Sequence, residues 1–249
     1  MKRVPSPARR LVAAGISAIS PATWDSSLAG ASRVLRRPLR RGGDKMYKIG
    51  NLLEADSEAT MYRSLLSAWQ HPESIVVNGT TGAGEVDEIM GRENPPALMD
   101  RMMLTDQSTY LPDDLLAKTD RASMAVSLEV RVPLIDHRVV QFAWRLPHQL
   151  KYRDGQNKWI LRQVLYRRIP RALIDRPKMG FSPPVENWLR GPLRGWAEDM
   201  IFSKANQGEE LRLPVIRKQW DDFQAGRNQS ANALWAVLMY QAWRERWIA

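Results

Sequence analysis

Apolar residues recur at helical spacing along most of the chain, and this pattern predicts a mainly helical fold. Met61, Leu65 and Trp69 lie on one side of a predicted helix over residues 57–70, and Ser57 is placed to cap its first turn. The same spacing predicts further helices over residues 97–111, from 112 onward, and over 136–146, 157–168, 185–189, 215–224 and 230–247. Only one short strand is expected, over residues 75–77, so the chain should have little or no sheet of its own.

Proline and glycine mark where the chain changes character. The predicted strand runs into Gly79-Thr80-Thr81-Gly82-Ala83-Gly84, and an acidic, loop-like stretch follows up to Pro96. Beyond Pro96, amphipathic helices follow one another closely. We therefore divide the chain into a basic and helical, loop-containing segment over residues 1–96 and a helical part over residues 97–249.

Basic residues outnumber acidic ones, and the formal net charge is +10. The excess is concentrated at the start, where Met1 to Gly43 hold nine basic residues and a single acid, Asp25. The rest of the chain mixes both signs along its helices. Because a nucleic-acid surface needs clustered positive charge, we do not expect one here.

The first twenty residues share some features with an export signal, since Lys2, Arg3, Arg9 and Arg10 precede a mildly apolar run, Leu11 to Ile19. The run is weak and no clean cleavage motif follows it. No apolar segment approaches the roughly 20 residues needed to cross a bilayer. We expect a soluble cytoplasmic protein with no membrane partner.

Several classes of site are disfavoured by composition. The chain has no cysteine, which excludes disulfides, thiolate metal sites and a cysteine nucleophile. Its three histidines, His71, His137 and His148, are scattered, so we expect no metal site.

Two glycine-containing stretches could be mistaken for phosphate loops. No Lys-Ser/Thr follows Gly79–Gly84, and the acidic residues after it would repel a phosphate, so a surface turn is favoured. Arg41-Gly42-Gly43-Asp44 lacks the serines and spacing of a Ser-Gly-Gly-x-Asp-Ser pyrophosphatase loop.

The strongest chemical candidate is Lys178, which lies between Pro177 and Gly180 in Arg176-Pro-Lys-Met-Gly-Phe181. A lysine in such a loop can bring a compact charge with three donors onto a polyphosphate. A lone loop lysine is more often simply solvated. Arg176 either assists Lys178 or anchors the loop.

A second polar stretch runs from Leu111 to Asp136. Asp120 and Arg121 lie at helical spacing among other charges, where ordinary ion pairing is the simplest interpretation. Glu129 and Arg131 alternate to the same side of an extended segment. Together with Asp136, which is also a predicted helix N-cap, they could form a partly buried network.

These two stretches, LPDDLLAKTDRASMAVSLEVRVPLID and RPKMGF, together resemble the carboxy-terminal part of the synthetase domain of glutamine-hydrolysing asparagine synthetases. PATWDSSL and GDKMYKIGNLLEADSEATMYRSLLSAW are similar to an upstream helical segment of that family. The resemblance implies that Lys178 contacts ATP phosphates, with Arg176 and Gly180 in the same loop. It implies supporting or substrate-binding roles for the following residues: Asp120, Arg121, Glu129, Arg131 and Asp136.

The resemblance also implies the fold and the partners. It identifies the chain as the helical carboxy-terminal portion of an α/β, adenine-nucleotide-hydrolase-like synthetase domain, from a truncated, split or wrongly started gene. The complete enzyme would use ATP, Mg²⁺, aspartate and ammonia from glutamine, proceeding through aspartyl-AMP. The family's glutaminase domain with its cysteine, its Ser-Gly-Gly-x-Asp-Ser loop and its acidic motif ending near Gly-Gly-Tyr do not occur in this sequence. We therefore expect the chain to bind no cofactor tightly and to be inactive alone, and to need the missing portion in cis or in trans.

Other functions stay open at this point. The chain could be a non-catalytic helical interaction protein, and it could form a homo-oligomer. Related adenylating enzymes use the same architecture to amidate other carboxylates or to close a β-lactam ring.

Overall fold

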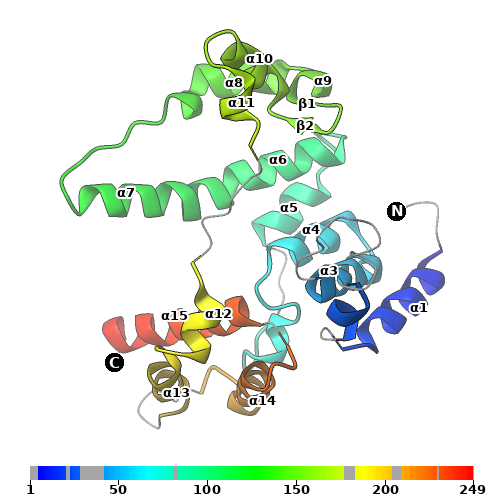
Figure 1. The fold of residues 1–249 in the computed structure, drawn as a ribbon, viewed down its shortest axis with the longest axis vertical. Helices are drawn as coiled ribbons and strands as arrows, with labels where there is room; N and C mark the ends of the chain where they lie inside the picture. Colours follow the sequence, from blue (N-terminus) through cyan, green and yellow to red (C-terminus); the bar gives the residue numbers. More distant parts are fainter. Residues whose placement is uncertain are drawn as a thin grey trace. The chain divides into compact units, whose positions relative to one another are not determined.

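The computed structural model describes residues 5–20, 23–28, 42–80, 84–176, 183–203, 209–228 and 230–248. Over these residues the fold is mainly helical, which confirms the predicted class (Figure 1). Among them, the only sheet is a two-stranded antiparallel hairpin. The chain forms two compact units, which we call unit 1 (Met1–Pro112 and Pro183–Ala249) and unit 2 (Asp113–Ser182).

The first half of unit 1 is a set of helices packed in chain order. Its members are α1 (Ser6–Ser17), α3 (Gly42–Glu54), α4 (Glu58–Leu66), α5 (Glu85–Gly91) and α6 (Leu98–Ser108). Buried apolar side chains join them, among them Ala13, Ile16, Tyr62 and Ile89. Arg9 donates from Nη1 to the carbonyl of Ala55 across 2.9 Å, just beyond the end of α3. This contact gives one residue of the basic amino-terminal stretch a structural role.

Two predictions for this half were wrong: the end of one helix, and the loop expected after the glycine-rich stretch. The helix capped by Ser57 was predicted to run to residue 70 but ends at Leu66, and the backbone of the next residue, Ser67, is extended. Trp69, which was predicted to lie in this helix, lies beyond its end and donates its indole N–H to the carbonyl of Ala233 in α15 (Ala231–Trp247) across 2.8 Å. The acidic stretch expected to be a loop instead forms α5, whose first turn places three carboxylates at the favourable end of the helix dipole.

The carboxy-terminal half of unit 1 holds the main hydrophobic core. Four helices build it: α12 (Val185–Arg190), α13 (Arg194–Phe202), α14 (Leu213–Gln224) and α15 (Ala231–Trp247). Leu189, Ile201, Ile216, Phe223 and Leu234 are completely buried between them. Sequence analysis predicted α12, α14 and α15 to within a few residues and did not predict α13.

The predicted strand over residues 75–77 is reduced to a single antiparallel bridge between Val76 and Leu211. Two backbone hydrogen bonds flank the bridge: Val77 donates to Glu210 across 2.7 Å, and Arg212 donates to Ile75 across 2.8 Å. The bridge ties the middle of the chain to the core in front of α14.

Unit 2 is helical, and its described residues form no buried core. A π-helical turn (Leu111–Leu116) contains Pro112, where a helix start was predicted, and leads into α7 (Ala117–Met124). The remaining elements are α8 (His137–Arg145), α9 (His148–Lys151), β1 (Tyr152–Arg153), β2 (Gln156–Asn157), α10 (Trp159–Tyr166) and α11 (Arg171–Ile174). None of the residues 113–176 is buried.

The hairpin of unit 2 was not predicted. Asp154 and Gly155 both have positive φ, 50° and 79°, and make the two-residue turn between β1 and β2. Such turns match the twist of paired strands. The hairpin takes up Asn157, so α10 begins at Trp159, later than predicted.

Candidate functional site

The predicted reactive loop is described only at its entrance. Lys178 and Gly180 lie outside the described residues. Arg176 is the last described residue before them, and its Nε donates to the carbonyl of Leu173 in α11 across 2.9 Å. Of the two roles considered for Arg176, this contact is an anchoring one.

Asp175 fastens this loop entrance to helix α10. Its Oδ1 accepts from Nη1 of Arg162 across 2.6 Å and from the hydroxyl of Tyr166 across 2.5 Å. Arg162 also donates from Nε to the carbonyl of Asn157 across 3.1 Å, which fixes its own position. The guanidinium of Arg171 lies 4.6 Å from the centre of the Tyr166 ring. The four contacts set the direction in which the chain leaves α11.

Sequence analysis missed this arrangement. Arg162 and Tyr166 are four residues apart and therefore share one face of α10. Asp175 directly precedes the Arg-Pro of the loop. The spacing of the first pair was a readable signal, whereas their meeting with Asp175 depends on the return of the chain through α11.

Asp120 and Arg121 lie on α7, and both are exposed. Among the described residues, neither forms an ion pair, while their neighbours Lys118 and Asp114 pair across 3.3 Å. The supporting role implied for Asp120 and Arg121 stays a prediction.

Glu129 and Arg131 do lie on the same side of an extended segment and pair with each other. Arg131 donates from Nε to Oε1 of Glu129 across 3.0 Å and from Nη2 to Oε2 across 3.3 Å. The side chains are 85% and 69% exposed for Arg131 and Glu129, so the partly buried network that was expected is not observed. A water-exposed pair of this kind contributes little stability.

Asp136 works separately from that pair. It caps α8, as predicted, by accepting from the backbone N–H of Arg138 across 2.9 Å. The guanidinium of Arg138 donates to both carboxylate oxygens, each across 2.9 Å. These hydrogen bonds, the side-chain ones first, hold the pKa of the Asp136 carboxyl below its usual value. Asp136 is therefore ionised at neutral pH, and both of its carboxylate oxygens accept hydrogen bonds from Arg138 at the start of α8.

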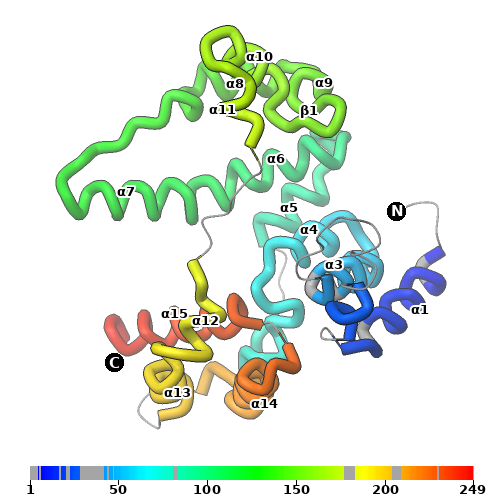
Figure 2. Tube along the Cα trace, in the orientation of Figure 1, coloured from blue at the N-terminus to red at the C-terminus, as the bar shows by residue number. Residues whose placement is uncertain are grey.

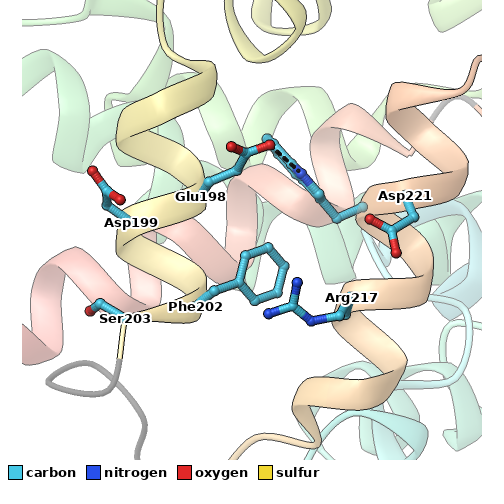
Figure 3. A pocket seen from close by; sticks show the side chains of 7 residues that line it. Glu198, Asp199, Phe202, Ser203, Arg217 and Asp221 are labelled. Carbon is cyan, nitrogen blue, oxygen red and sulfur yellow. Dashed lines mark hydrogen bonds between the residues drawn. The ribbon is translucent and has the colours of Figure 1, made fainter.

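An open polar pocket of about 350 Å³ lies between α13 and α14 in unit 1 (Figure 3). The guanidinium of Arg217 stacks 3.9 Å from the centre of the Phe202 ring, and Trp220 donates its indole N–H to Glu198 across 3.2 Å. Two further carboxylates, Asp199 and Asp221, line it. None of the predicted site residues that the structure describes lies here, and three carboxylates against one guanidinium do not suit a phosphate ligand.

Neither glycine-containing stretch has the features of a phosphate-binding loop over the residues that the structure describes. Gly42 and Gly43 open helix α3, and the N–H of Gly43 is already taken by the carboxylate of Asp25 across 2.9 Å. The start of α5 at Gly84 carries three acidic residues, which would repel a phosphate. Within the described ranges, no group of three His, Cys, Asp or Glu residues is placed to hold a metal ion.

Comparison with known proteins identifies the family. The family model described as asparagine synthase matches residues 11–245. A Mycobacterium tuberculosis protein bearing the name of a glutamine-hydrolyzing asparagine synthetase is 35% identical over 144 residues, which cover 57% of this chain and 22% of the relative. Asparagine synthetase 1 of Bacillus subtilis is 28% identical over 145 residues, covering 58% and 23%. The chicken asparagine synthetase is 30% identical over 121 residues, covering 45% and 21%.

The class that the described residues define is thus a mainly helical protein. The chain belongs to the asparagine synthase family. It spans about a fifth of the length of the curated relatives it matches. No solved structure matches it significantly. Over the part that the structure describes, no helix combines the length and the apolar character needed to cross a membrane.

Proposed function

We propose that this chain is one part of a glutamine-hydrolysing asparagine synthetase and contributes to the ATP-dependent amidation of aspartate. In that reaction the aspartate carboxylate displaces pyrophosphate from ATP, and ammonia then displaces AMP from aspartyl-AMP. The observation that carries the proposal is the family match over residues 11–245. We place the protein in the cytoplasm as part of the same proposal.

Within this proposal, Lys178 supplies positive charge to the phosphate oxygens as pyrophosphate leaves. A lysine is suited to the task because its ammonium is compact and carries three donors. The contacts of Asp175 support this assignment, because they fasten the chain three residues before Lys178 to helix α10.

Other parts of the reaction are assigned to chain that lies outside these 249 residues. The described residues hold no phosphate-binding loop and no set of metal ligands, so we give them no role in holding Mg²⁺ or the ATP triphosphate. The sequence also has no cysteine to release ammonia from glutamine. We therefore expect the 249-residue chain to be inactive by itself and active when joined or mixed with the rest of a synthetase.

Exchange of labelled pyrophosphate into ATP, measured in the presence of aspartate, tests the proposal. The purified chain should give no exchange above background. A mixture with the remaining portion of the Mycobacterium tuberculosis relative, from which the aligned 144 residues have been deleted, should restore it. Aspartate-dependent exchange by the chain alone would contradict the assigned incompleteness, and a stable mixture without exchange would contradict the assigned activity.

Lys178→Ala tests the role of the lysine in the same mixture. We expect exchange to fall by roughly 100-fold or more, as is typical when a charge that stabilises a transition state is removed. Lys218→Ala, which removes an exposed lysine from α14, is the matched control and should leave exchange unchanged. Full activity of Lys178→Ala would mean that the lysine is only a solvated loop residue.

A further inference from the structure

A five-residue stretch of unit 2, Leu128–Val132, runs extended between α7 and a 3-10 turn at Pro133–Ile135. We call it the edge segment. Figure 2 shows the trace from α7 to α8 following this extended course. Five residues is a typical length for a β-strand. In the described part of the chain, however, the edge segment is paired with no strand, since the only sheet there joins β1 to β2.

Over the part of the chain that the structure describes, the backbone of the edge segment is available for pairing. Among the described residues, the amides of Glu129, Val130, Arg131 and Val132 donate to no backbone carbonyl. The carbonyl of Val132 accepts from Ile135 across 3.2 Å, which closes the segment at its far end. A row of unpaired amides and carbonyls is the feature by which an edge strand accepts another strand.

The two faces of the edge segment differ. Glu129 and Arg131 form their ion pair on one face. Leu128, Val130 and Val132 project from the other and are 59%, 46% and 38% exposed. An apolar row beside a polar one is the pattern of a strand that is half covered by a core.

That core is not supplied by unit 2. No residue from 113 to 176 is buried, and apolar side chains that flank the edge segment are also exposed, namely Met124, Val126 and Leu134. Unit 1, in contrast, buries a continuous apolar cluster between α12 and α15. Unit 2 therefore presents strand-forming backbone and unburied apolar surface at one place.

We propose that the edge segment pairs with a β-strand from the portion of the synthetase that lies outside this chain, and that this portion also covers its apolar face. The proposal rests on the proposed function in taking the rest of the synthetase as the partner. The length of the relatives supports this choice, because the aligned stretch is only 22% of the Mycobacterium tuberculosis protein. The remaining chain is long enough to supply both a strand and a covering layer.

A second copy of this chain is the main competing occupant. In an antiparallel pair centred on Val130, Glu129 of each copy would face Arg131 of the other, which is a favourable arrangement. It would, however, bring together two copies of unit 2, none of whose described residues is buried, and it would leave most of the exposed apolar positions of α8, α10 and α11 uncovered. The experiment therefore includes an arm that detects self-pairing.

Hydrogen exchange of the amides of residues 129–132 measures the pairing directly. In the 249-residue chain these amides should exchange rapidly at every protein concentration. In the complex with the remaining portion of the Mycobacterium tuberculosis relative, they should slow by at least about tenfold, as expected when amides enter a sheet. Failure of the two parts to form a complex, or a complex in which these amides stay fast, overturns the proposal.

Two matched variants test separately the apolar face and the charged face of the edge segment. Val130→Asp places a charge on the apolar face and should weaken the complex by at least about tenfold. Glu129→Gln/Arg131→Gln, on the opposite face, should leave its affinity within about threefold. Circular dichroism of the isolated variants controls for folding, which both should retain because Val130 is 46% exposed and the other two side chains are more exposed still. Equal affinity of Val130→Asp and the unaltered chain overturns the proposal.

Self-pairing has its own signature. Protection that rises with the concentration of the chain alone, is lost in Glu129→Arg and returns in Glu129→Arg/Arg131→Glu would assign the edge segment to a second copy and overturn the proposal. These measurements do not depend on pyrophosphate exchange. A protected edge in an inactive complex would contradict the proposed function and leave the pairing intact, and an unprotected edge in an active complex would do the reverse.

Discussion

Arg162 on α10 donates to Asp175 across 2.6 Å, and in doing so it joins a helix to the residue that precedes the Arg-Pro-Lys loop. Tyr166, one turn further along α10, donates to the same carboxylate oxygen across 2.5 Å. Two donors from one helix face define both the position and the direction of the carboxylate. Helix α10 thus fixes the position of the loop entrance. Under the role proposed for Lys178 this matters, because a charge that stabilises a transition state must be placed within a fraction of an ångström.

Asp175→Asn should loosen this entrance. The neutral amide loses the charge-assisted hydrogen bonds from Arg162 and Tyr166, and we expect the amides of α11 to exchange roughly two- to fivefold faster. If Lys178 has the role proposed for it, aspartate-dependent pyrophosphate exchange in the mixture with the rest of a synthetase should fall by roughly tenfold, because the lysine would be less well positioned. Hydrogen exchange of the α11 amides measures the first effect, and the pyrophosphate-exchange assay measures the second.

Asp154→Asn provides the control for Asp175→Asn. Asp154 lies in the hairpin turn, is 89% exposed and makes only a long contact of 3.6 Å with Arg153. The same chemical change there should alter neither measurement. Equal effects of the two substitutions would show that the contacts of Asp175 do not hold the loop entrance.

The features that sequence analysis predicted correctly are those encoded locally. Ser57 and Asp136 cap their helices as expected, because a cap needs only a short polar side chain beside the first N–H groups. Helix α15 follows from an apolar pattern repeated over many turns. These local signals were sufficient to predict the mainly helical class of the fold.

Two of the features that were missed depend on contacts between distant residues, whereas the hairpin of unit 2 is a local feature. Nothing near Trp69 indicates that its indole bonds to Ala233, and this contact is associated with the early end of α4. The hairpin around Asp154-Gly155 has strands of two residues each, too short for an alternating pattern to register. Asp175 finds its partners only once α11 has turned the chain back toward α10.

Ser57→Ala should destabilise the amino-terminal helices of unit 1. The Ser57 hydroxyl accepts from the N–H of Thr60 across 3.0 Å, and the loss of such a cap costs about 1 kcal/mol. Ser57→Asp should restore most of the stability, because a carboxylate also caps and favours the helix dipole. Urea unfolding of the three proteins measures the differences, and equal stability of Ser57→Ala and the original would mean that the cap is replaced by water.

Tyr62 should make unit 1 sensitive to alkali. It is 4% exposed, and its hydroxyl donates to Asp106 and, across 3.3 Å, to the carbonyl of Met102. Burial first, and then the Asp106 carboxylate, raise the pKa of the phenol above its usual value. A raised folded-state pKa means that the contribution of the phenol is complete below the unfolded pKa of about 10 and is lost as the pH rises above it.

The test compares the original chain with Tyr62→Phe from pH 8 to pH 11. At pH 8 the original should be the more stable of the two, because the variant leaves Asp106 and the carbonyl of Met102 without their donor. The difference should shrink above about pH 10, by no more than about 1.4 kcal/mol per pH unit for a single proton. A difference that stays constant over this range would show that the phenol can ionise in the folded state.

The two units should respond differently to the same loss of apolar volume. Leu234 is completely buried in the core of unit 1, so Leu234→Ala should cost about 2–5 kcal/mol. Leu161 on α10 is 46% exposed, so Leu161→Ala should cost less than about 1 kcal/mol in the isolated chain. Native-state hydrogen exchange measures both costs, since it follows α15 and α10 separately.

If the rest of a synthetase covers unit 2, the cost of Leu161→Ala should rise toward the core value in the complex, because removing the side chain would then leave a cavity. An unchanged, small cost would mean that this face of α10 stays in water even in the assembled enzyme.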